Sequence, residues 1–197
     1  MGLVQRIVLP CLIGASLGLG LSCRTDINAP VISSFAPTSS PVGTSVVITG
    51  TDLTGATSVT LNNLAIDVFS VDSGTQITAT IPSAASSGVI TVTTPGGTAT
   101  TSNTFSVTPT ITGLSPSSGV AGAASVSITG SGFIGATQVA FVDASSNTFT
   151  ATTYSVDSAN AITVTAPVGL VSGTAYYLQV VAAGITSASS PTSFTAN

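Results

Sequence analysis

Chemistry in this chain would have to rest on very few ionisable side chains. Its 197 residues contain six acidic and two basic side chains and no histidine, giving a formal net charge of −4. Because Glu, Lys and His are all missing, most general acid–base pairs and any Ser-His-Asp or Cys-His site cannot be assembled. We therefore expect a protein that is not an enzyme and has no catalytic residues. The acidic side chains are Asp26, Asp52, Asp67, Asp72, Asp143 and Asp157.

Two aspartates stand in matching local sequences. Asp72 and Asp157 each follow Ser-Val and precede Ser. One role would be calcium binding, but calcium takes six to eight oxygens, commonly from several carboxylates together. The alternative, which we favour, is a turn residue whose carboxylate accepts hydrogen bonds from nearby backbone amides. Zinc would need clustered Cys and His, so we expect neither a metal nor any other cofactor.

Two further aspartates lie in the first half of the chain and have no counterpart in the second. Asp52 follows Gly50 at a turn position, and Asp67 lies beside Ile66 near a strand end. A glycosidase would need two carboxyl groups facing each other across a cleft, and nothing in this spacing places them so. With Arg6 and Arg24 as the two basic residues, the chain also lacks the cations that bind phosphates, so we expect no nucleic acid.

A sugar-binding surface would use exposed aromatic residues, and the three tyrosines are candidates for it. In the alternating segment 176–180, Tyr176 shares a face with Leu178 and Val180 and is expected in the core. Tyr177 falls on the opposite face and is the better candidate for exposure, while Tyr154 is undecided. Because single exposed aromatics are normal on surfaces, the ligand-binding residues stay unknown.

The first 22 residues have the pattern of a secretory signal peptide. Arg6 precedes an apolar run at residues 7–21, which is shorter than the roughly 20 residues of a membrane span. The run ends in Gly20-Leu21-Ser22-Cys23, which resembles the lipobox of bacterial lipoproteins. The resemblance implies lipidation of Cys23 and a tether at residues 23–29. An ordinary signal peptide that contains a cysteine is the alternative.

The expected location follows from this segment. We expect an exported protein, held in a membrane by the lipid on Cys23 or else secreted. In the resemblance to lipoproteins, an Asp directly after the lipidated Cys favours the inner membrane. Arg24 stands there instead, which leaves the outer membrane or cell surface open.

The remaining chain repeats itself. Pairs of similar segments recur at an offset that grows along the chain, as expected when loops take up insertions. The main insertion, at residues 143–147, has the composition of a hairpin tip. The paired segments are 30–37 with 109–116, 47–50 with 127–130, 55–59 with 135–139, 69–73 with 154–158, 81–82 with 166–167, and Phe105 with Phe194.

Both copies read as short β-strands. Apolar, mostly β-branched residues alternate with Ser and Thr, and Gly or Pro punctuates the chain at intervals of about ten residues. We therefore predict an all-β protein of two β-sandwiches. The alternating core positions are Val46 and Ile48, Val59 and Leu61, Ile77, Ala79 and Ile81, Ile90 and Val92, Val126 and Ile128, Val139 and Phe141, and Ile162 and Val164.

These repeated motifs resemble the IPT/TIG domain, an immunoglobulin-like fold. The resemblance rests on Pro-x-Ile-x-x-Phe/Leu-x-Pro followed by Ile-Thr-Gly and Gly-Ala-Thr, and it covers residues 30–108 and 109–197. It implies two tandem immunoglobulin-like domains and no single activity, because this fold serves many functions. The short junction at residues 106–109, with Pro109 and no Gly/Ser linker, predicts a stiff rod.

The composition narrows the remaining roles. Charged residues make up 4% of the chain and the mean hydropathy is +0.65, so charge repulsion contributes little to solubility. We expect adhesion, binding or spacing at the cell surface, with a protein or a glycan as partner. The alternative is a self-assembling subunit of an extracellular filament or coat. The many hydroxyl groups would also be available for glycosylation.

Overall fold

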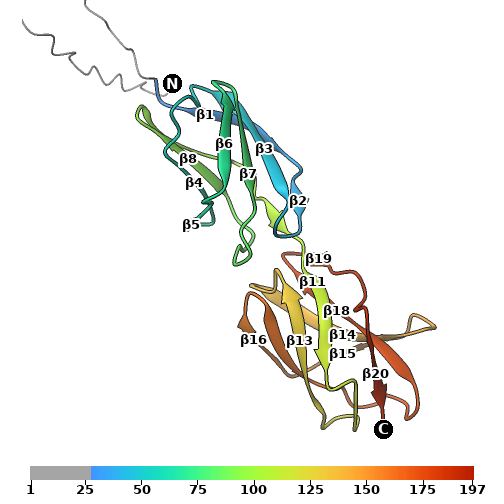
Figure 1. Cartoon of the computed structure of the whole chain (residues 1–197). Helices are drawn as coiled ribbons and strands as arrows, with labels where there is room; N and C mark the ends of the chain where they lie inside the picture. Colours follow the sequence, from blue (N-terminus) through green and yellow to red (C-terminus); the bar gives the residue numbers. More distant parts are fainter. Residues whose placement is uncertain (1–27) are drawn as a thin grey trace, which may run out of the picture.

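The computed structural model describes residues 28–197, and every regular element within them is a β-strand. The all-β prediction is therefore confirmed. The strands form two sandwiches placed end to end, so that β1 begins at one end and the chain finishes at the other (Figure 1). The predicted signal peptide and Cys23 lie outside the described residues.

The first domain packs two four-stranded sheets against each other. One sheet has the order β1-β3-β7-β6 and the other β5-β4-β8-β9, while β2 and β10 form a short parallel pair. The strands are β1 (Val31–Ala36), β2 (Ser39–Ser40), β3 (Ser45–Thr51), β4 (Ser58–Leu61), β5 (Leu64–Ala65), β6 (Phe69–Ser73), β7 (Gln76–Thr80), β8 (Ile90–Thr94), β9 (Gly97–Thr100) and β10 (Ser106–Val107).

The second domain repeats this arrangement. Its first sheet has the order β11-β13-β17-β16, and its second has the order β12-β20-β18-β14-β15, with β19 also paired to β18. The strands are β11 (Thr110–Ser115), β12 (Ser118–Gly119), β13 (Ser125–Ser131), β14 (Ala136–Asp143), β15 (Thr148–Thr150), β16 (Tyr154–Ser158), β17 (Ala161–Thr165), β18 (Ala175–Ala182), β19 (Ile185–Thr186) and β20 (Ser193–Ala196).

Each domain has its own hydrophobic core, built from the inward faces of these strands. All the alternating core positions named above are buried, each no more than 1% exposed. Phe105 and Phe194, the paired aromatics near the end of each copy, are also fully buried. The period-two pattern therefore identified the buried faces correctly, because successive side chains of a strand point to opposite sides.

The hairpin between β14 and β15 matches the predicted insertion. Val142 pairs with Thr148, which leaves residues 143–147 as the tip. Asp143 Oδ1 accepts hydrogen bonds from the amides of Ser145 and Asn147 at 2.8 and 2.9 Å, and its Oδ2 accepts from Asn147 Nδ2 at 2.8 Å. The Asn147 side chain, followed by its backbone amide, lowers the pKa of Asp143 from its ordinary value of 3.8. This aspartate therefore holds the tip in shape.

Candidate functional site

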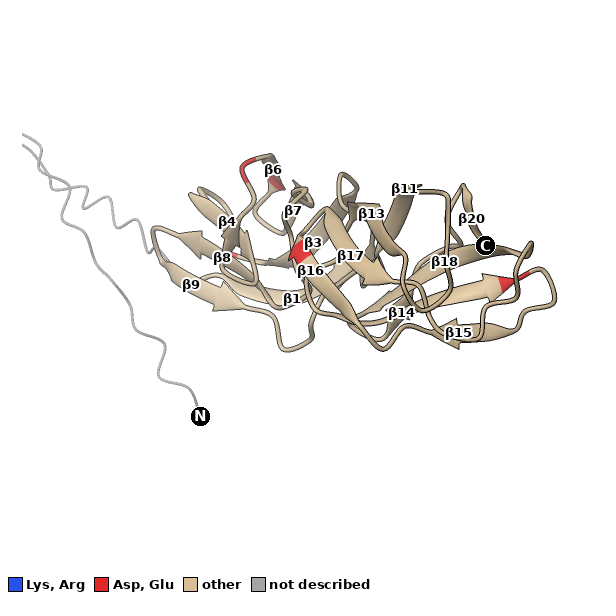
Figure 2. Ribbon diagram, turned by 90° about the horizontal axis from the view of Figure 1, so that it is seen from below, with Lys and Arg blue, Asp and Glu red and all other residues tan. Residues whose placement is uncertain are grey.

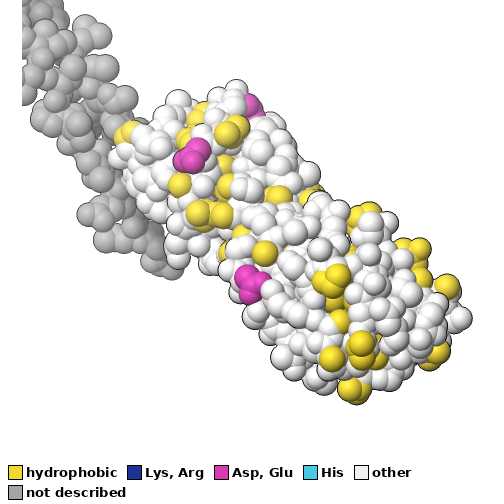
Figure 3. All heavy atoms as spheres, turned by 60° about the horizontal axis from the view of Figure 1, so that its bottom comes forward, with side chains coloured by type: hydrophobic (Ala, Val, Ile, Leu, Met, Phe, Trp, Pro, Cys, Tyr) yellow, Lys and Arg dark blue, Asp and Glu magenta, His cyan; other side chains and the backbone are white. Residues whose placement is uncertain are grey.

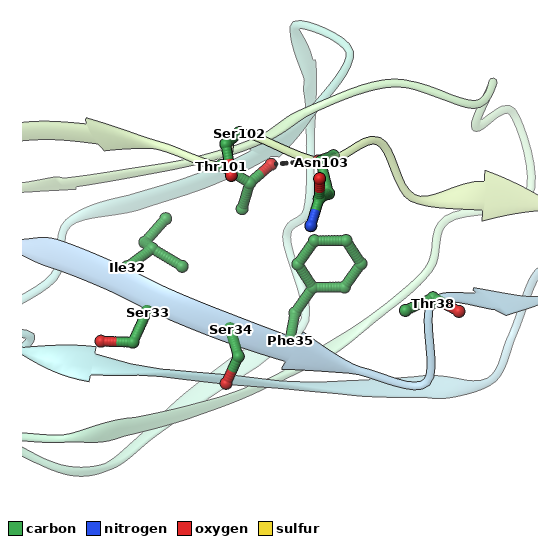
Figure 4. Close-up of a pocket in the computed structure, with 8 residues that line it drawn as sticks. All are labelled: Ile32, Ser33, Ser34, Phe35, Thr38, Thr101, Ser102 and Asn103. Atoms are coloured by element: carbon green, nitrogen blue, oxygen red, sulfur yellow. Dashed lines mark hydrogen bonds between the residues drawn. The ribbon is translucent and has the colours of Figure 1, made fainter.

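A groove of about 260 Å³ opens on the first domain between β1 and the segment that follows β9 (Figure 4). β1 and β9 are both edge strands, one in each sheet, so the groove runs along an open side of the sandwich. It is lined by Ile32, Ser33, Ser34, Phe35, Thr38, Thr101, Ser102 and Asn103.

A β-bulge in β1 shapes one wall of the groove. The pairing of β1 with β3 shifts register between Ile32 and Ser34, so Ser33 is an extra residue. As a result Ile32 and Phe35, which are three residues apart, both point toward residues 101–103, whereas Ser33 and Ser34 point to the other side (Figure 4). The Phe35 ring also packs against Phe105, with ring centroids 6.2 Å apart. This wall is therefore apolar and supported from behind.

The opposite wall is polar and is fixed by the hydroxyl of Thr101. The Ile90 amide donates to Thr101 Oγ1 at 3.0 Å, and that hydroxyl donates to the carbonyl of Asn103 at 2.8 Å. Thr101 is itself buried. The arrangement holds the chain beside the groove and directs the Asn103 side chain toward the Phe35 ring (Figure 4).

The two walls define what the groove can bind. Its lining residues carry hydroxyl, amide, phenyl and aliphatic groups, and none of them is ionisable. An apolar wall facing hydroxyl and amide groups suits a neutral ligand with one apolar face and several polar edges. The volume lies just below the roughly 300–1,000 Å³ of pockets for drug-sized molecules, so the groove fits a group about the size of one ring.

The second domain provides an internal comparison for this groove. There the Leu178 amide donates to Ser190 Oγ at 2.8 Å, and Ser190 Oγ donates to the Thr192 carbonyl at 2.7 Å. Ser190 and Thr192 thus stand where the first domain has Thr101 and Asn103. The bulge recurs in β11, where Leu114 replaces Phe35. The frame is therefore common to both domains, whereas the Phe35 and Asn103 side chains belong to the first alone.

The matching aspartates lie in strands at bulges, not in turns as we expected. The hydroxyls of Ser70 and Thr78 donate to Asp72 at 2.9 and 2.6 Å. The hydroxyls of Ser155 and Thr163 donate to Asp157, both at 2.7 Å. The carboxylates therefore accept from side chains of their own and the neighbouring strand. The Ser155 hydroxyl, and then that of Thr163, lower the pKa of Asp157 from its ordinary value of 3.8.

The acidic residues are spread along the molecule rather than gathered (Figure 2). Asp52 follows β3 with a φ of 56°, the turn position expected, and Asn28 Nδ2 lies 3.4 Å from its Oδ1. Asp67 is exposed between β5 and β6. Within residues 28–197, no three His, Cys, Asp or Glu side chains stand close enough to hold a metal ion.

Two tyrosines occupy the environments predicted for them. Tyr176 is 1% exposed, and its hydroxyl accepts a hydrogen bond from the Val171 amide at 2.8 Å. Its ring packs edge-on against Phe149 at 5.5 Å. Tyr177 is 42% exposed but belongs to the second domain, so it takes no part in the groove. Tyr154 is half-buried, and its hydroxyl donates to the Ala136 carbonyl at 3.2 Å.

Sequence reasoning missed the groove. The repeats already pair Phe35 with Leu114, but pairing Asn103 with Thr192 requires the hydrogen bonds of Thr101 and Ser190. When the two domains are aligned by these hydrogen bonds, Asn103 of the first domain corresponds to Thr192 of the second. The Asn103 amide is then seen to be absent from the second domain.

The sandwiches, their strand orders and the repeated hydroxyl contacts define a tandem immunoglobulin-like protein. The model of the IPT/TIG domain matches residues 30–107 and 109–196, and the chain belongs to this family. Comparison with curated protein sequences finds no match. Among residues 28–197, no helix has the length and apolar character needed to cross a bilayer.

Several solved structures are similar to this chain. Surface glycan-binding protein PbSGBP-B from Prevotella bryantii is 16% identical, with a TM-score of 0.52 over 84% of this chain and 42% of its own. A protein crystallised with a xylogluco-oligosaccharide is 24% identical, with a TM-score of 0.49 over 80% and 39%. SGBP-B from a complex xyloglucan utilization locus of Bacteroides uniformis is 17% identical, with a TM-score of 0.38 over 85% and 49%. This chain thus spans less than half the length of each.

Proposed function

We propose that this chain is a non-enzymatic cell-surface protein whose first domain binds a neutral glycan in the groove between β1 and Asn103. The observation that carries the proposal is the pair of unlike walls: Ile32 and Phe35 on one side, and Asn103 on the other. Sugar rings combine an apolar C–H face with hydroxyl edges, and these walls are complementary to both.

The internal comparison supports a binding role for these residues. Phe35 and Asn103 are replaced by Leu114 and Thr192 in the second domain, which keeps the same bulge and hydroxyl frame. Folding therefore does not require the Asn103 amide. A polar side chain that the fold does not need, placed against an aromatic ring at the rim of a groove, is well suited to contact a ligand.

PbSGBP-B shares its fold with this chain, and this shared fold is the support that it gives to a glycan as the ligand class. That protein is described as a surface glycan-binding protein, and the immunoglobulin-like architecture is what it shares with this chain. The absence of ionisable groups from the groove lining selects a neutral glycan over an acidic one.

The location is part of the same proposal. Residues 1–22 would direct export, and a lipid on Cys23 would hold the protein at a membrane with residues 24–29 as a tether. Mass spectrometry of the mature N-terminus tests this: an added lipid mass on Cys23 supports it, and a free amine at another residue contradicts it.

Isothermal titration of residues 24–197 with neutral oligosaccharides tests glycan binding. A xylogluco-oligosaccharide is the first choice because a structural neighbour was crystallised with one. Asn103→Thr, which installs the residue of the second domain, should weaken binding about 5- to 10-fold, since a lost hydrogen bond is worth about 1 kcal/mol.

Thr192→Asn is the matched control, because it makes the reverse change in the second domain and should leave the affinity unchanged. Binding that survives Asn103→Thr undiminished would contradict the proposed site. A ligand set restricted to acidic glycans, or to peptides, would contradict the proposed ligand class.

A further inference from the structure

Two aspartates lie in strands at the edges of sheets. Asp72 belongs to β6 and Asp157 to β16, and each strand is the last in its sheet, paired on one side only. Both aspartates are exposed. Residues 28–197 contain no Lys or Arg, so aspartate is the charged residue available to the two domains. On the face drawn in Figure 3, the acidic side chains stand apart from one another among uncharged and hydrophobic ones.

The two edge strands have sequences that favour pairing with a further strand. An unpaired edge exposes a row of backbone donors and acceptors that a strand of another chain can join. Residues 69–73 and 154–158 each alternate an aromatic residue and a valine with serine, and they contain neither Gly nor Pro. In β16 the valine, Val156, is 37% exposed. The charge of the aspartate is therefore what opposes association in each segment.

Each aspartate is the extra residue of a β-bulge. The pairing of β6 with β7 shifts register between Val71 and Ser73, which leaves Asp72 without a partner residue across the ladder. The pairing of β16 with β17 shifts in the same way at Asp157. A bulge twists an edge strand away from the flat shape that a second sheet could join.

Hydroxyl groups hold each carboxylate over the outer face of its sheet. The Asp72 carboxylate accepts from Ser70 on its own strand and from Thr78 on β7. Thr78 lies between the buried Ile77 and Ala79, so its side chain points outward. The second domain repeats this geometry. The charge is thus fixed beside the unpaired edge, on a face where the side chains of an added strand would lie.

The bulge itself does not require an aspartate. The other long edge strands, β1 and β11, have bulges whose extra residues are Ser33 and Thr112. Those strands also lie beside β9 and β18 of the facing sheets, whereas β6 and β16 contact chiefly β7 and β17. The bulges that contain an aspartate are therefore on the more open edges.

We propose that Asp72 and Asp157 keep the β6 and β16 edges from pairing with the same edges of another copy of this chain. Antiparallel pairing of two such edges would bring carboxylates to the same face of the joined sheet, and like charges on neighbouring strands destabilise their pairing. The bulge disturbs the regular ladder that the new strand would need, and the charge opposes the approach as well. Together they keep the folded chain monomeric although it has few other charges.

The test compares two double variants of residues 24–197 that have the same net charge. The edge variant, Asp72→Asn with Asp157→Asn, removes the charges from β6 and β16. The loop variant, Asp52→Asn with Asp67→Asn, removes two exposed charges that lie outside the strands. Sedimentation velocity at concentrations up to about 1 mM measures assembly. The edge variant should assemble at a concentration at least about fivefold lower than the loop variant, which should behave as the parent chain does.

Further variants separate the charge from its hydrogen bonds. Ser70→Lys and Ser155→Lys, added to the edge variant, restore a charge to each edge strand without restoring the carboxylate. Assembly should then return to the level of the loop variant. Circular dichroism and thermal unfolding establish that each variant is folded before it assembles. The single substitutions Asp72→Asn and Asp157→Asn, which each alter one domain, should have intermediate effects.

Three results would overturn the proposal. They are equal assembly of the edge and loop variants, an edge variant that stays monomeric up to the highest concentration, and a parent chain that already assembles through these edges. Assembly that the two lysines do not suppress would contradict a role for charge, because lost hydrogen bonds would then be its cause.

Discussion

The carbonyl oxygen of Val31 occupies the place that a Cβ on residue 50 would need. The bulge in β1 brings that carbonyl against β3, and glycine is the residue that leaves room for it. The second domain repeats the relationship between the Thr110 carbonyl and Gly130. The glycine of the repeated Ile-Thr-Gly motif is thus explained by the bulge, and the bulge turns Ile32 and Phe35 toward the groove.

Gly50→Ala should destabilise the first domain by about 2–4 kcal/mol, since its methyl group overlaps backbone atoms that cannot move without breaking the β1–β3 pairing. Chemical denaturation measures the loss. Gly43→Ala is the comparison: nothing lies within 4 Å of its Cβ, but φ is +79°, so a smaller cost of about 1 kcal/mol is expected. Equal losses would contradict the overlap argument.

Thr101→Val should cost about 1–3 kcal/mol, because it removes a buried hydroxyl that accepts from Ile90 and donates to Asn103. Ser190→Ala should have a similar effect in the second domain. Unfolding in urea provides the measurement. Thr100→Val, which removes an exposed hydroxyl paired with Thr91, should stay within about 0.5 kcal/mol of the parent chain.

Asp157→Asn should reduce the acid sensitivity of the second domain. The hydroxyls of Ser155 and Thr163 lower the pKa of Asp157 in the folded state, so its stabilising effect is present above the ordinary value of 3.8. That effect is lost as the pH falls through the lower folded-state pKa. Thermal midpoints measured from pH 5 down to about 2 should fall less steeply in the variant, with Asp67→Asn as the control.

Tyr176→Phe should reduce the stability of the second domain, whereas Tyr177→Ser should leave stability unchanged. The first removes the acceptor of the Val171 amide and should cost about 1 kcal/mol in denaturation experiments. The second changes an exposed side chain remote from the groove and should alter neither stability nor glycan affinity. A large loss of glycan affinity in Tyr177→Ser would place the binding surface in the second domain instead.

The alternating residues predicted the inward faces of the longer strands, because side-chain direction in a strand has a fixed period of two. The same pattern placed Tyr176 in the core and Tyr177 outside. It could not predict the parallel pairing of β2 with β10 or of β12 with β20, because two-residue strands have too few side chains to show a period.

The candidate site depends on features that no local sequence pattern predicts. The bulge at Ser33 reverses the alternation of β1, and the approach of Asn103 to Phe35 joins residues far apart in the chain. The bulges also explain why Asp72 and Asp157 lie in strands although their surroundings in sequence resemble turns. Such positions are decided by tertiary contacts, which composition and spacing do not encode.

The parallel pairs formed by β2 with β10 and β12 with β20 have a mechanical consequence. In each domain a strand near its beginning is bonded to a strand near its end, as by Ser106 to Thr38 and Asn197 to Gly119. Tension between the two ends of the molecule would pull these partners in opposite directions along their length. The bonds would then be strained together in shear instead of opening one at a time, so each domain should resist being pulled open from its two ends.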